Sequence, residues 1–232
     1  MNLEIIPVTE IGAVAPGDDL AALLAVALEP LSPSSGDVLV VTHKIVSKAE
    51  GAVVHIEGDE EGFRRRLIES EAISIVRRRG GLIIAETKHG FICANAGIDR
   101  SNTEPGTMVL LPEDPDRSAH RIRTRLEHHF SVDLAVIVSD TFGRPWRKGL
   151  TDVAIGLSGL EAILDLKGTT DWSGHELEVT EVAVADELAA AADLVMGKAA
   201  GIPAALIRGY AGPRGAGRGG DLVRPASEDL FR

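Results

Sequence analysis

The stretch Leu-Ala-Val-Ile-Val-Ser-Asp-Thr-Phe-Gly-Arg-Pro-Trp-Arg, at positions 134–147, joins an apolar run to a polar and basic turn. Its first part, Leu134 to Val138, has the length and the β-branched content of a buried strand. Asp140 follows this strand, and Arg144 and Arg147 come next in a segment that contains Gly and Pro. Such a strand end is suited to holding a hard cation beside a polyphosphate. The stretch therefore predicts a metal ion on Asp140 and phosphates on the two arginines.

The flanking sequence predicts a mixture of helices, crossovers and hairpins. Four segments have the apolar spacing of helices, at 20–30, 60–78, 115–130 and 182–196. Further apolar runs are typical of strands, at 38–41, 151–166 and 203–207, and the pair 82–85 and 91–94 suits a hairpin. We expect an α+β fold with a mixed sheet, and the 3% aromatic content predicts an aliphatic core.

Composition excludes several classes of protein. The 232 residues carry a net charge of -11, which argues against a nucleic-acid binder, because such a protein needs a basic surface. The chain has one cysteine, Cys93, so it contains neither an intrachain disulfide nor a Cys-based zinc site. The longest apolar run, Leu20 to Leu28, is too short to span a bilayer, and the first residues lack a signal pattern. We expect a cytoplasmic enzyme that binds neither membranes nor nucleic acid.

A second carboxylate, Asp99, also follows a predicted strand. One sheet edge can bring Asp99 and Asp140 together as two ligands of one Mg²⁺ or Mn²⁺. Asn102 and Thr141 add neutral oxygen donors at short spacing from these carboxylates. The alternative is that each Asp only caps a turn, which is common for an Asp at a strand end.

Several other residues have two interpretations each. Lys48 lies near the end of the first predicted strand beside His43, where an ammonium can neutralise phosphate, although most lysines are simply exposed. No Gly-x4-Gly-Lys-[Ser/Thr] occurs, so a P-loop is excluded. The Gly- and Arg-rich segment 209–220 is either a flexible surface loop or a phosphate-facing lid. Trp146 and Trp172 either stack on a ring or pack in the core.

Short motifs along most of the chain resemble those of the coenzyme F420-0:L-glutamate ligase family, also called the γ-glutamyl ligase of the deazaflavin coenzyme. The shared motifs, in order, are Pro-Gly-Asp-Asp-Leu at 16–20, Val-Val-Thr at 40–42, Val-Ser-Lys-Ala-Glu-Gly at 46–51, Ala-Gly-Ile-Asp at 96–99, Ser-Asn at 101–102, Ser-Asp-Thr-Phe-Gly-Arg-Pro-Trp-Arg at 139–147, Asp-Val-Ala-Ile-Gly at 152–156, Thr180, and Ala-Asp-Glu-Leu-Ala at 185–189. Such an ordered series is specific. The resemblance implies one ligase domain over residues 1–232, with two interleaved subdomains, mixed and antiparallel sheets, and a homodimeric assembly.

The activity implied by the resemblance is a GTP-dependent ligase that joins L-glutamate to the carboxylate of F420-0. Because a carboxylate does not react with an amine, the γ-phosphoryl group of GTP is expected to form an acyl phosphate first. The implied ions are two Mg²⁺ or Mn²⁺, with K⁺ as a further candidate. Asp99 and Asp140 hold one divalent ion and Thr141 serves the second. Asp140, Arg144 and Arg147 are the expected catalytic residues.

The resemblance also implies a set of residues that contact GTP. They are Ile11, Gly12, Ala13, Val14, His43, Lys44, Lys48, Asn102, Met196, Gly197, Lys198 and Pro203. Lys198 departs from relatives that offer a metal-binding Gln or Glu in this loop. Since an ammonium cannot ligate a metal, either a backbone carbonyl serves there or the second metal site differs.

Two alternative functions fit the same residues. One is a GTP-dependent ligase or phosphotransferase that acts on a different carboxylate with the same metal site. A phosphorylated acceptor without glutamate would support this alternative. The other is a non-catalytic nucleotide-binding module that regulates a partner. The pair Asp99 and Asp140 argues against the second, because binding alone does not require a metal pair.

Overall fold

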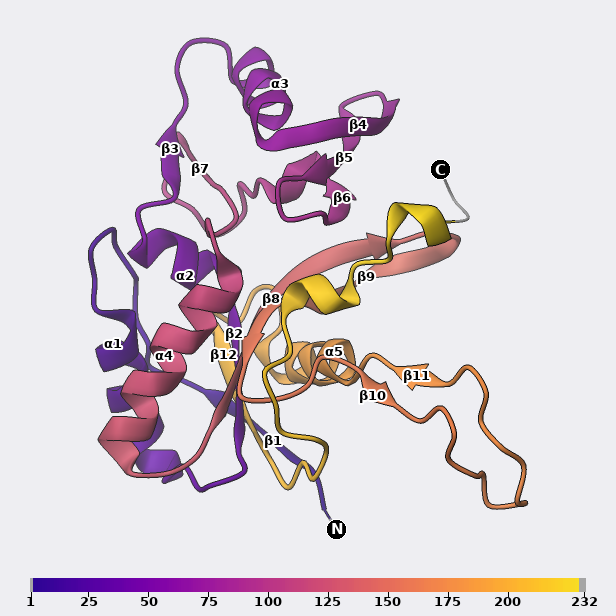
Figure 1. The fold of residues 1–232 in the computed structure, drawn as a ribbon. Coiled ribbons are helices and arrows are strands. Elements are labelled where there is room, and N and C mark those ends of the chain that lie inside the picture. Colours follow the sequence, from indigo (N-terminus) through magenta and orange to yellow (C-terminus); the bar gives the residue numbers. More distant parts are fainter. Residues whose placement is uncertain (1, 230–232) are drawn as a thin grey trace.

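A computed structural model describes residues 2–229, and its largest element is a five-stranded sheet (Figure 1). The strands are, in spatial order, β1 (Glu4–Val8), β12 (Ala204–Arg208), β2 (Val38–Thr42), β8 (Ala135–Arg144) and β9 (Arg147–Ser158). The central pair β2 and β8 is parallel, with Thr42 opposite Ser139, and the other neighbours are antiparallel. The end of β2 therefore lies beside the middle of β8, at Ser139.

Helices cover both faces of this sheet, as the two sides of the strands in Figure 1 show. On one face α1 (Leu20–Leu28) and α4 (Pro115–Phe130) share a core with Val41 of β2. On the other face α5 (Val184–Met196) shares a core with Val40. Successive side chains of a strand point to opposite faces, so a strand covered on both sides must be apolar at every position. This requirement explains the unbroken apolar runs of β2 and β8.

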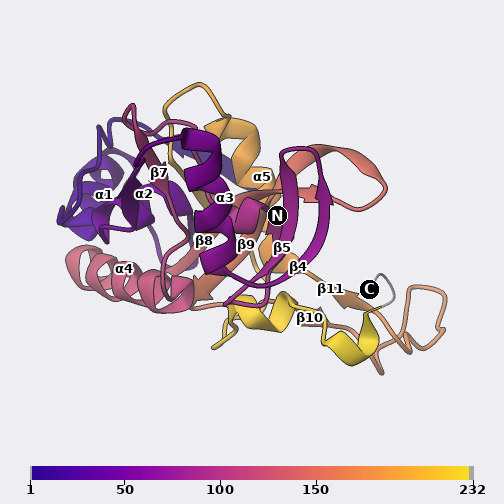
Figure 2. The same cartoon turned by 90° about the horizontal axis from the view of Figure 1, so that it is seen from above.

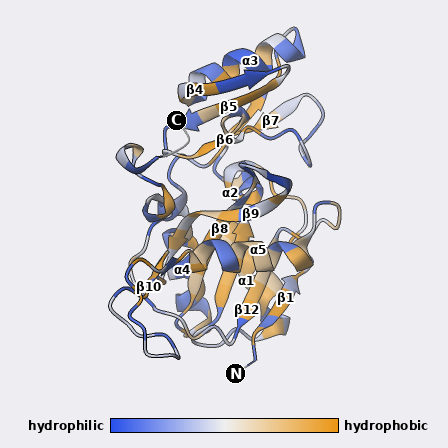
Figure 3. Cartoon of the chain, turned by 90° about the vertical axis from the view of Figure 1, so that its right-hand side faces the viewer, coloured by the Kyte–Doolittle hydropathy of each residue, from blue (hydrophilic) through white to orange (hydrophobic). Residues whose placement is uncertain are grey.

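Residues 53–109 form a smaller region beyond the end of β2, inserted between β2 and α4 (Figure 3). Its elements are β3 (Val53–His55), α3 (Glu60–Glu71), β4 (Ala72–Arg79), β5 (Leu82–Thr87), β6 (Ile92–Ala94), a 3₁₀ helix (Asn95–Gly97) and β7 (Thr107–Val109). Strands β4, β5 and β6 form an antiparallel sheet, and β3 pairs with β7. Seen from above, this region lies over the ends of the main strands (Figure 2). Helix α2 (His43–Ala49) joins it to β2.

The C-terminal part adds short elements at the surface. These are β10 (Leu164–Asp165), β11 (Glu181–Val182) and two 3₁₀ helices, Gly219–Leu222 and Ala226–Glu228. Within residues 2–229, no helix is both long and apolar enough to cross a membrane. Segment 209–220 is largely irregular, and Gly217 N–H donates to Leu160 O over 3.1 Å. Arg214 contacts Gly36 O before β2 begins, at the opposite end of that strand from Thr42, which contradicts the interpretation of the segment as a phosphate lid.

The α+β class and most predicted elements are confirmed. Helix 20–30 is α1 followed by a 3₁₀ helix (Glu29–Leu31), and Asp19 caps α1 by accepting Ala22 N–H over 3.2 Å. Helices 115–130 and 182–196 are α4 and α5, and Gly197 follows α5 with a positive φ of 59°. The predicted hairpin is β5 and β6.

Three predictions need correction. The helix predicted over 60–78 ends at Glu71, because Ile73, Ile75 and Val76 favour the extended β4, which pairs with β5. The strand predicted to end at Val138 continues to Arg144, so the basic segment is a β-ribbon whose tip is the Pro145-Trp146 pair. The strand-like segment 151–166 is split into β9 and β10.

Candidate active site

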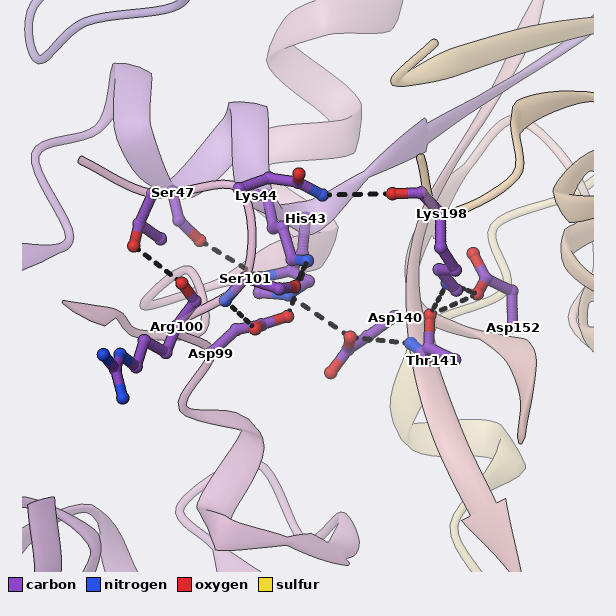
Figure 4. Close-up of polar contacts among 12 residues, drawn as sticks. His43, Lys44, Ser47, Asp99, Arg100, Ser101, Asp140, Thr141, Asp152 and Lys198 are labelled. Atoms are coloured by element: carbon purple, nitrogen blue, oxygen red, sulfur yellow. Dashed lines mark hydrogen bonds and ion pairs between the residues drawn. The ribbon is translucent and has the colours of Figure 1, made fainter. Parts of the chain in front are cut away.

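The buried end of β2 places a histidine against the β8 carboxylate. His43 is the first residue of α2, and 1% of its surface is exposed. Its Nε2 lies 3.2 Å from Asp140 Oδ1, although the direction does not satisfy a hydrogen bond, and its Nδ1 is 3.4 Å from Ser47 Oγ. Ligands of α/β proteins bind at the carboxyl ends of parallel strands, and this is where β2 ends. Figure 4 shows His43 and Asp140 together at this end.

The next residue of α2, Lys44, brings in a second carboxylate from the smaller region. Lys44 Nζ lies 2.7 Å from Asp99 Oδ2 and donates to Ser101 Oγ over 2.6 Å. Ser101 N–H in turn donates to Asp99 Oδ1 over 2.7 Å. Burial opposes ionisation of Asp99, but Lys44 and Ser101 outweigh it and lower the pKa of this carboxyl. Asp99 and Asp140 therefore lie beside the first two residues of α2, Lys44 and His43 respectively.

A separate cluster forms around Asp152, which is opposite Thr141 in the β8–β9 pairing. Asp152 is 1% exposed and accepts hydrogen bonds from Thr141 Oγ1 over 2.6 Å and from Ser139 Oγ over 2.9 Å. Lys198 Nζ lies 3.0 Å from Asp152 Oδ1, contacts Thr141 Oγ1, and lies 3.4 Å from Asp193 Oδ1. Burial disfavours the Lys198 ammonium, but Asp152 and Asp193 prevail and raise its pKa.

Asn102 links these clusters through its main chain and side chain. Lys48 Nζ donates to Asn102 O over 2.7 Å, and Asn102 Nδ2 donates to Lys198 O over 3.3 Å. Burial and then the nearby charge of Lys44 lower the pKa of Lys48. Three ammonium groups, those of Lys44, Lys48 and Lys198, thus surround one end of the sheet. An ammonium can bind a phosphate oxygen as a point charge, so the three lysines are candidates for a polyphosphate, and in the structure Lys44 and Lys198 are paired with Asp99 and Asp152.

The donor set at the His43–Lys44 turn is compatible with a hard divalent cation. Asp99 and Asp140 offer carboxylate oxygens, and Asp140 faces the buried Nε2 of His43, whose hydrogen-bonding capacity is unsatisfied. Within residues 2–229, no group of three or more His, Cys, Asp or Glu side chains is arranged to hold a metal. Mg²⁺ often binds through one or two carboxylates plus substrate phosphates and water, which is the mode that this pair permits.

Cys93 of β6 shows how closely the smaller region approaches Asp140. Burial first, and then the negative charge of Asp140, raise the pKa of the Cys93 thiol to about 12. A thiol with this pKa is not a nucleophile at neutral pH. The described residues therefore provide no activated thiol.

Comparison with known proteins identifies the family. The family profile described as F420-0:Gamma-glutamyl ligase matches residues 9–209. The chain belongs to this family. It is 44% identical to the coenzyme F420:L-glutamate ligase of Methanopyrus kandleri, over 100% of this chain and 98% of that protein. Identity to the protein of the same name from Methanothermobacter thermautotrophicus is 44% over 100% of both chains, and to that of Methanocaldococcus jannaschii 45% over 85% of both chains.

In this member of the F420-0:gamma-glutamyl ligase family, the structure brings together eight of the predicted site residues. They are His43, Lys44, Lys48, Asp99, Asn102, Asp140, Thr141 and Lys198. Asp140 and Thr141 are consecutive on β8, and their side chains have different partners, because a strand directs neighbouring side chains to opposite faces. Asp140 approaches His43, whereas Thr141 approaches Asp152.

Other predicted residues lie outside this network. The side chains of Ile11, Val14 and Met196 are buried in the two main cores, so only their main chains are available to a nucleotide. Gly12, Ala13 and Gly197 are exposed. Pro203 O accepts Thr42 N–H over 2.9 Å at the strand end.

The predicted catalytic arginines lie on the exposed β8–β9 ribbon. Arg144 Nη2 donates to Lys148 O over 3.4 Å, so this arginine closes the ribbon tip. At about 3.3 Å per residue, the Cα of Arg144 lies roughly 13 Å along β8 from that of Asp140. Arg147, the first residue of β9, is also exposed.

Asp152 was missed as a site residue, although it opens the Asp-Val-Ala-Ile-Gly motif. Its role depends on the β8–β9 register, which places it opposite Thr141. The available signal was the motif itself, in which a carboxylate precedes an apolar strand segment. Asp193 was also missed, because nothing in the sequence distinguishes it from other carboxylates on helices. Its proximity to Lys198 is evident only in the structure.

Proposed function

We propose that this chain is a GTP-dependent ligase that joins L-glutamate to the carboxylate of F420-0. Its relatives carry the name coenzyme F420:L-glutamate ligase. The observation that carries the proposal is the position of Asp99 beside Lys44 and of Asp140 beside His43, at the start of the helix that also carries Lys48. Such a site supplies both a cation-binding carboxylate pair and positive charge for phosphates.

The proposed reaction has two steps. A carboxylate oxygen of F420-0 attacks the γ-phosphorus of GTP, the bond to the β-phosphate oxygen breaks, and GDP and an acyl phosphate form. The amine of glutamate then attacks the acyl carbon, the bond to the phosphate oxygen breaks, and the amine releases its proton. The products are an amide, GDP and inorganic phosphate. No side-chain nucleophile takes part in this scheme.

Side chains of the site offset charge and orient the phosphates. We assign Lys44, Lys48 and Lys198 to the polyphosphate, since each carries an ammonium towards the strand ends. Asn102 holds Lys48 and the Lys198 main chain in register with one another. Positions fixed in this way need little reorganisation when charge develops in the transition state.

The proposal also assigns ligands to the divalent ions and a role to Arg144 and Arg147 of the β8–β9 ribbon. Asp99 and Asp140 would hold Mg²⁺ or Mn²⁺, which neutralises phosphate charge as a Lewis acid. Thr141 is the proposed contributor to a second divalent ion, and K⁺ is a further candidate ion. Because Arg144 and Arg147 lie away from Asp140, we assign them to outer groups of the bound substrates rather than to the reacting phosphorus. We further propose a cytoplasmic homodimer.

Mass spectrometry tests the proposal. The protein is incubated with F420-0, GTP, L-glutamate and Mn²⁺, beside an Asp140→Ala variant. Asp133→Ala is a matched control, because this exposed carboxylate precedes the other end of β8. We expect F420-0 to gain one or more glutamyl units with the wild type and the control, and none with Asp140→Ala. GTP-dependent phosphorylation without glutamate addition would contradict the proposal.

A further inference from the structure

An apolar cavity of about 540 Å³ lies between β4–β6 of the smaller region, the β8–β9 ribbon and the C-terminal segment. Its aromatic lining consists of Phe91, Phe142 and Trp146. Aliphatic side chains complete the walls, among them Val76 and Val223. Lys44, Lys48 and Lys198 do not line this cavity, so it is separate from the cluster of lysines.

The cavity adjoins the carboxylate that the reaction uses. Phe142 is two residues beyond Asp140 on β8, so both side chains point to the same face of the strand. Val153, another lining residue, is the direct cross-strand partner of Asp140. Such partners have Cβ atoms about 4.5–5.5 Å apart. The wall of the cavity therefore passes beside Asp140, which does not itself line it.

The aromatic side chains are arranged to accept a flat ring. Phe91 and Phe142 meet edge to face with ring centroids 6.3 Å apart, and His89 stacks on Phe91 at 5.6 Å. Trp146 has a φ of 57°, a left-handed conformation that is rare for a bulky residue, and 80% of its surface is exposed. Residues held in such rare backbone conformations cluster at active sites and ligand clamps.

The lysines and the apolar cavity lie in different directions from Asp140. The ammonium groups of Lys44, Lys48 and Lys198 lie towards α2 and the loop after α5, whereas the cavity lies along β8 towards the ribbon tip. Because the ammonium groups would hold the triphosphate of GTP away from this cavity, the cavity is available to the ring of the acceptor.

We propose that this cavity binds the fused aromatic ring of the deazaflavin acceptor, with the acceptor carboxylate directed to Asp140. The inference rests on the proposed function and specifies where its acceptor lies. Arg77 and Arg224 line the cavity together with Asp186 and Asp229, so the lining carries both signs of charge and offers a guanidinium group to an anionic group of the acceptor. Trp146 is then a specificity residue that stacks on the ring, and the basic ribbon carries it.

Fluorescence titration tests this placement without turnover. The chain has two tryptophans, so Trp172→Phe leaves Trp146 as the single reporter. F420-0 is added without GTP or glutamate, and we expect it to quench Trp146. In equilibrium dialysis, Trp146→Ala should weaken F420-0 binding about tenfold or more and leave GTP binding unchanged, as expected for loss of one stacking contact. Trp172→Ala is the matched control, because this 99% exposed side chain lies in the β10–β11 loop.

A second variant places a charge in the cavity itself. Val76→Glu changes a partly exposed lining residue of β4, and it should likewise weaken F420-0 binding. Unchanged F420-0 affinity in both Trp146→Ala and Val76→Glu would overturn the inference, and so would a loss of GTP affinity in their place. Tight F420-0 binding without any glutamyl product would leave the placement supported and contradict the proposed function instead.

Discussion

The site contains two lysine–aspartate pairs that differ in their surroundings. Lys44 and Asp99 are 2.7 Å apart, and the Asp99 side chain is 29% exposed. Lys198 and Asp152 are 3.0 Å apart, but the Asp152 side chain is 1% exposed and also accepts hydrogen bonds from Ser139 and Thr141. The Asp99 carboxylate is accessible and can exchange its ammonium partner, whereas the buried Asp152 carboxylate already accepts from several donors.

This difference indicates different roles for the two pairs. An accessible carboxylate held by one ammonium and one main-chain N–H can release the ammonium in favour of a cation that arrives with phosphates. A buried carboxylate with several fixed donors is costly to disturb and holds its neighbours in place. We therefore assign ion binding to Asp99 with Asp140, and the orientation of Thr141 and Lys198 to Asp152.

The largest effect is expected from Asp99→Asn. The amide retains the shape of the carboxylate but loses the charge that binds a divalent cation. We expect the initial rate of glutamate incorporation to fall by about 100-fold, in the range typical of disturbed metal sites. Thermal unfolding should show a folded protein, because Asp99 is partly exposed. A rate equal to that of the wild type would remove Asp99 from the ion site.

The second prediction concerns the stability of the buried pair. Asp152→Ala leaves the hydroxyl of Ser139, a residue that is fully buried, without its acceptor. An unsatisfied buried polar group costs about 1–3 kcal/mol, so we expect urea denaturation to show a loss of that size. Asp133→Ala is the control and should change stability by less than about 0.5 kcal/mol. Equal stability of the two variants would show that Asp152 is not a structural anchor.

A third prediction separates the lysines by pH. Burial and the charge of Lys44 lower the pKa of Lys48, so its ammonium is lost at lower pH than that of an ordinary lysine. Affinity for GTP should therefore decline as pH rises through this lowered pKa, by up to about tenfold for loss of one charged contact. Lys48→Arg keeps its charge and should abolish the decline. An identical alkaline profile for both proteins would contradict the assignment.

The smallest expected effect is on acid stability without divalent ions. The folded pKa of Asp99 lies below its ordinary value of 3.8, so its contribution is fully present above that value. The contribution is lost as pH falls through the folded pKa. Because Asp99 is partly exposed, we expect its contribution to the free energy of unfolding to be less than about 1 kcal/mol. Below pH about 4, the free energy of unfolding should decline less steeply for Asp99→Asn than for the wild type. Parallel curves of unfolding free energy against pH would contradict the assigned Lys44–Asp99 ion pair.

The sequence predicted the strand-end residues of the site because strand ends are local features. The apolar run of β2 ends at Thr42 and that of the buried part of β8 near Asp140, so polar residues beyond them were expected at one edge. In the structure His43 lies beside Asp140 and Lys44 beside Asp99, two contacts that the sequence did not predict. Apolar periodicity also predicted the three helices that cover the sheet.

Features that depend on pairing were not readable from the sequence. Asp152 gains its role only when the ribbon register places it opposite Thr141. Segment 72–79 has charges and aliphatic residues that fit a helix as well as a strand, and pairing with β5 decides between them. Pairing of β8 with β9 likewise places the predicted catalytic arginines, Arg144 and Arg147, on an extended ribbon. Local propensity does not specify such partners.

The fate of one oxygen atom shows whether the site activates the carboxylate of F420-0. F420-0 labelled with ¹⁸O in its carboxylate is converted with GTP and L-glutamate, and the released inorganic phosphate is analysed by mass spectrometry. If the site activates the acceptor as an acyl phosphate, one labelled oxygen moves from the carboxylate to the phosphate. Phosphate without ¹⁸O, formed together with the glutamyl product, would contradict carboxylate activation at the Asp99–Asp140 site.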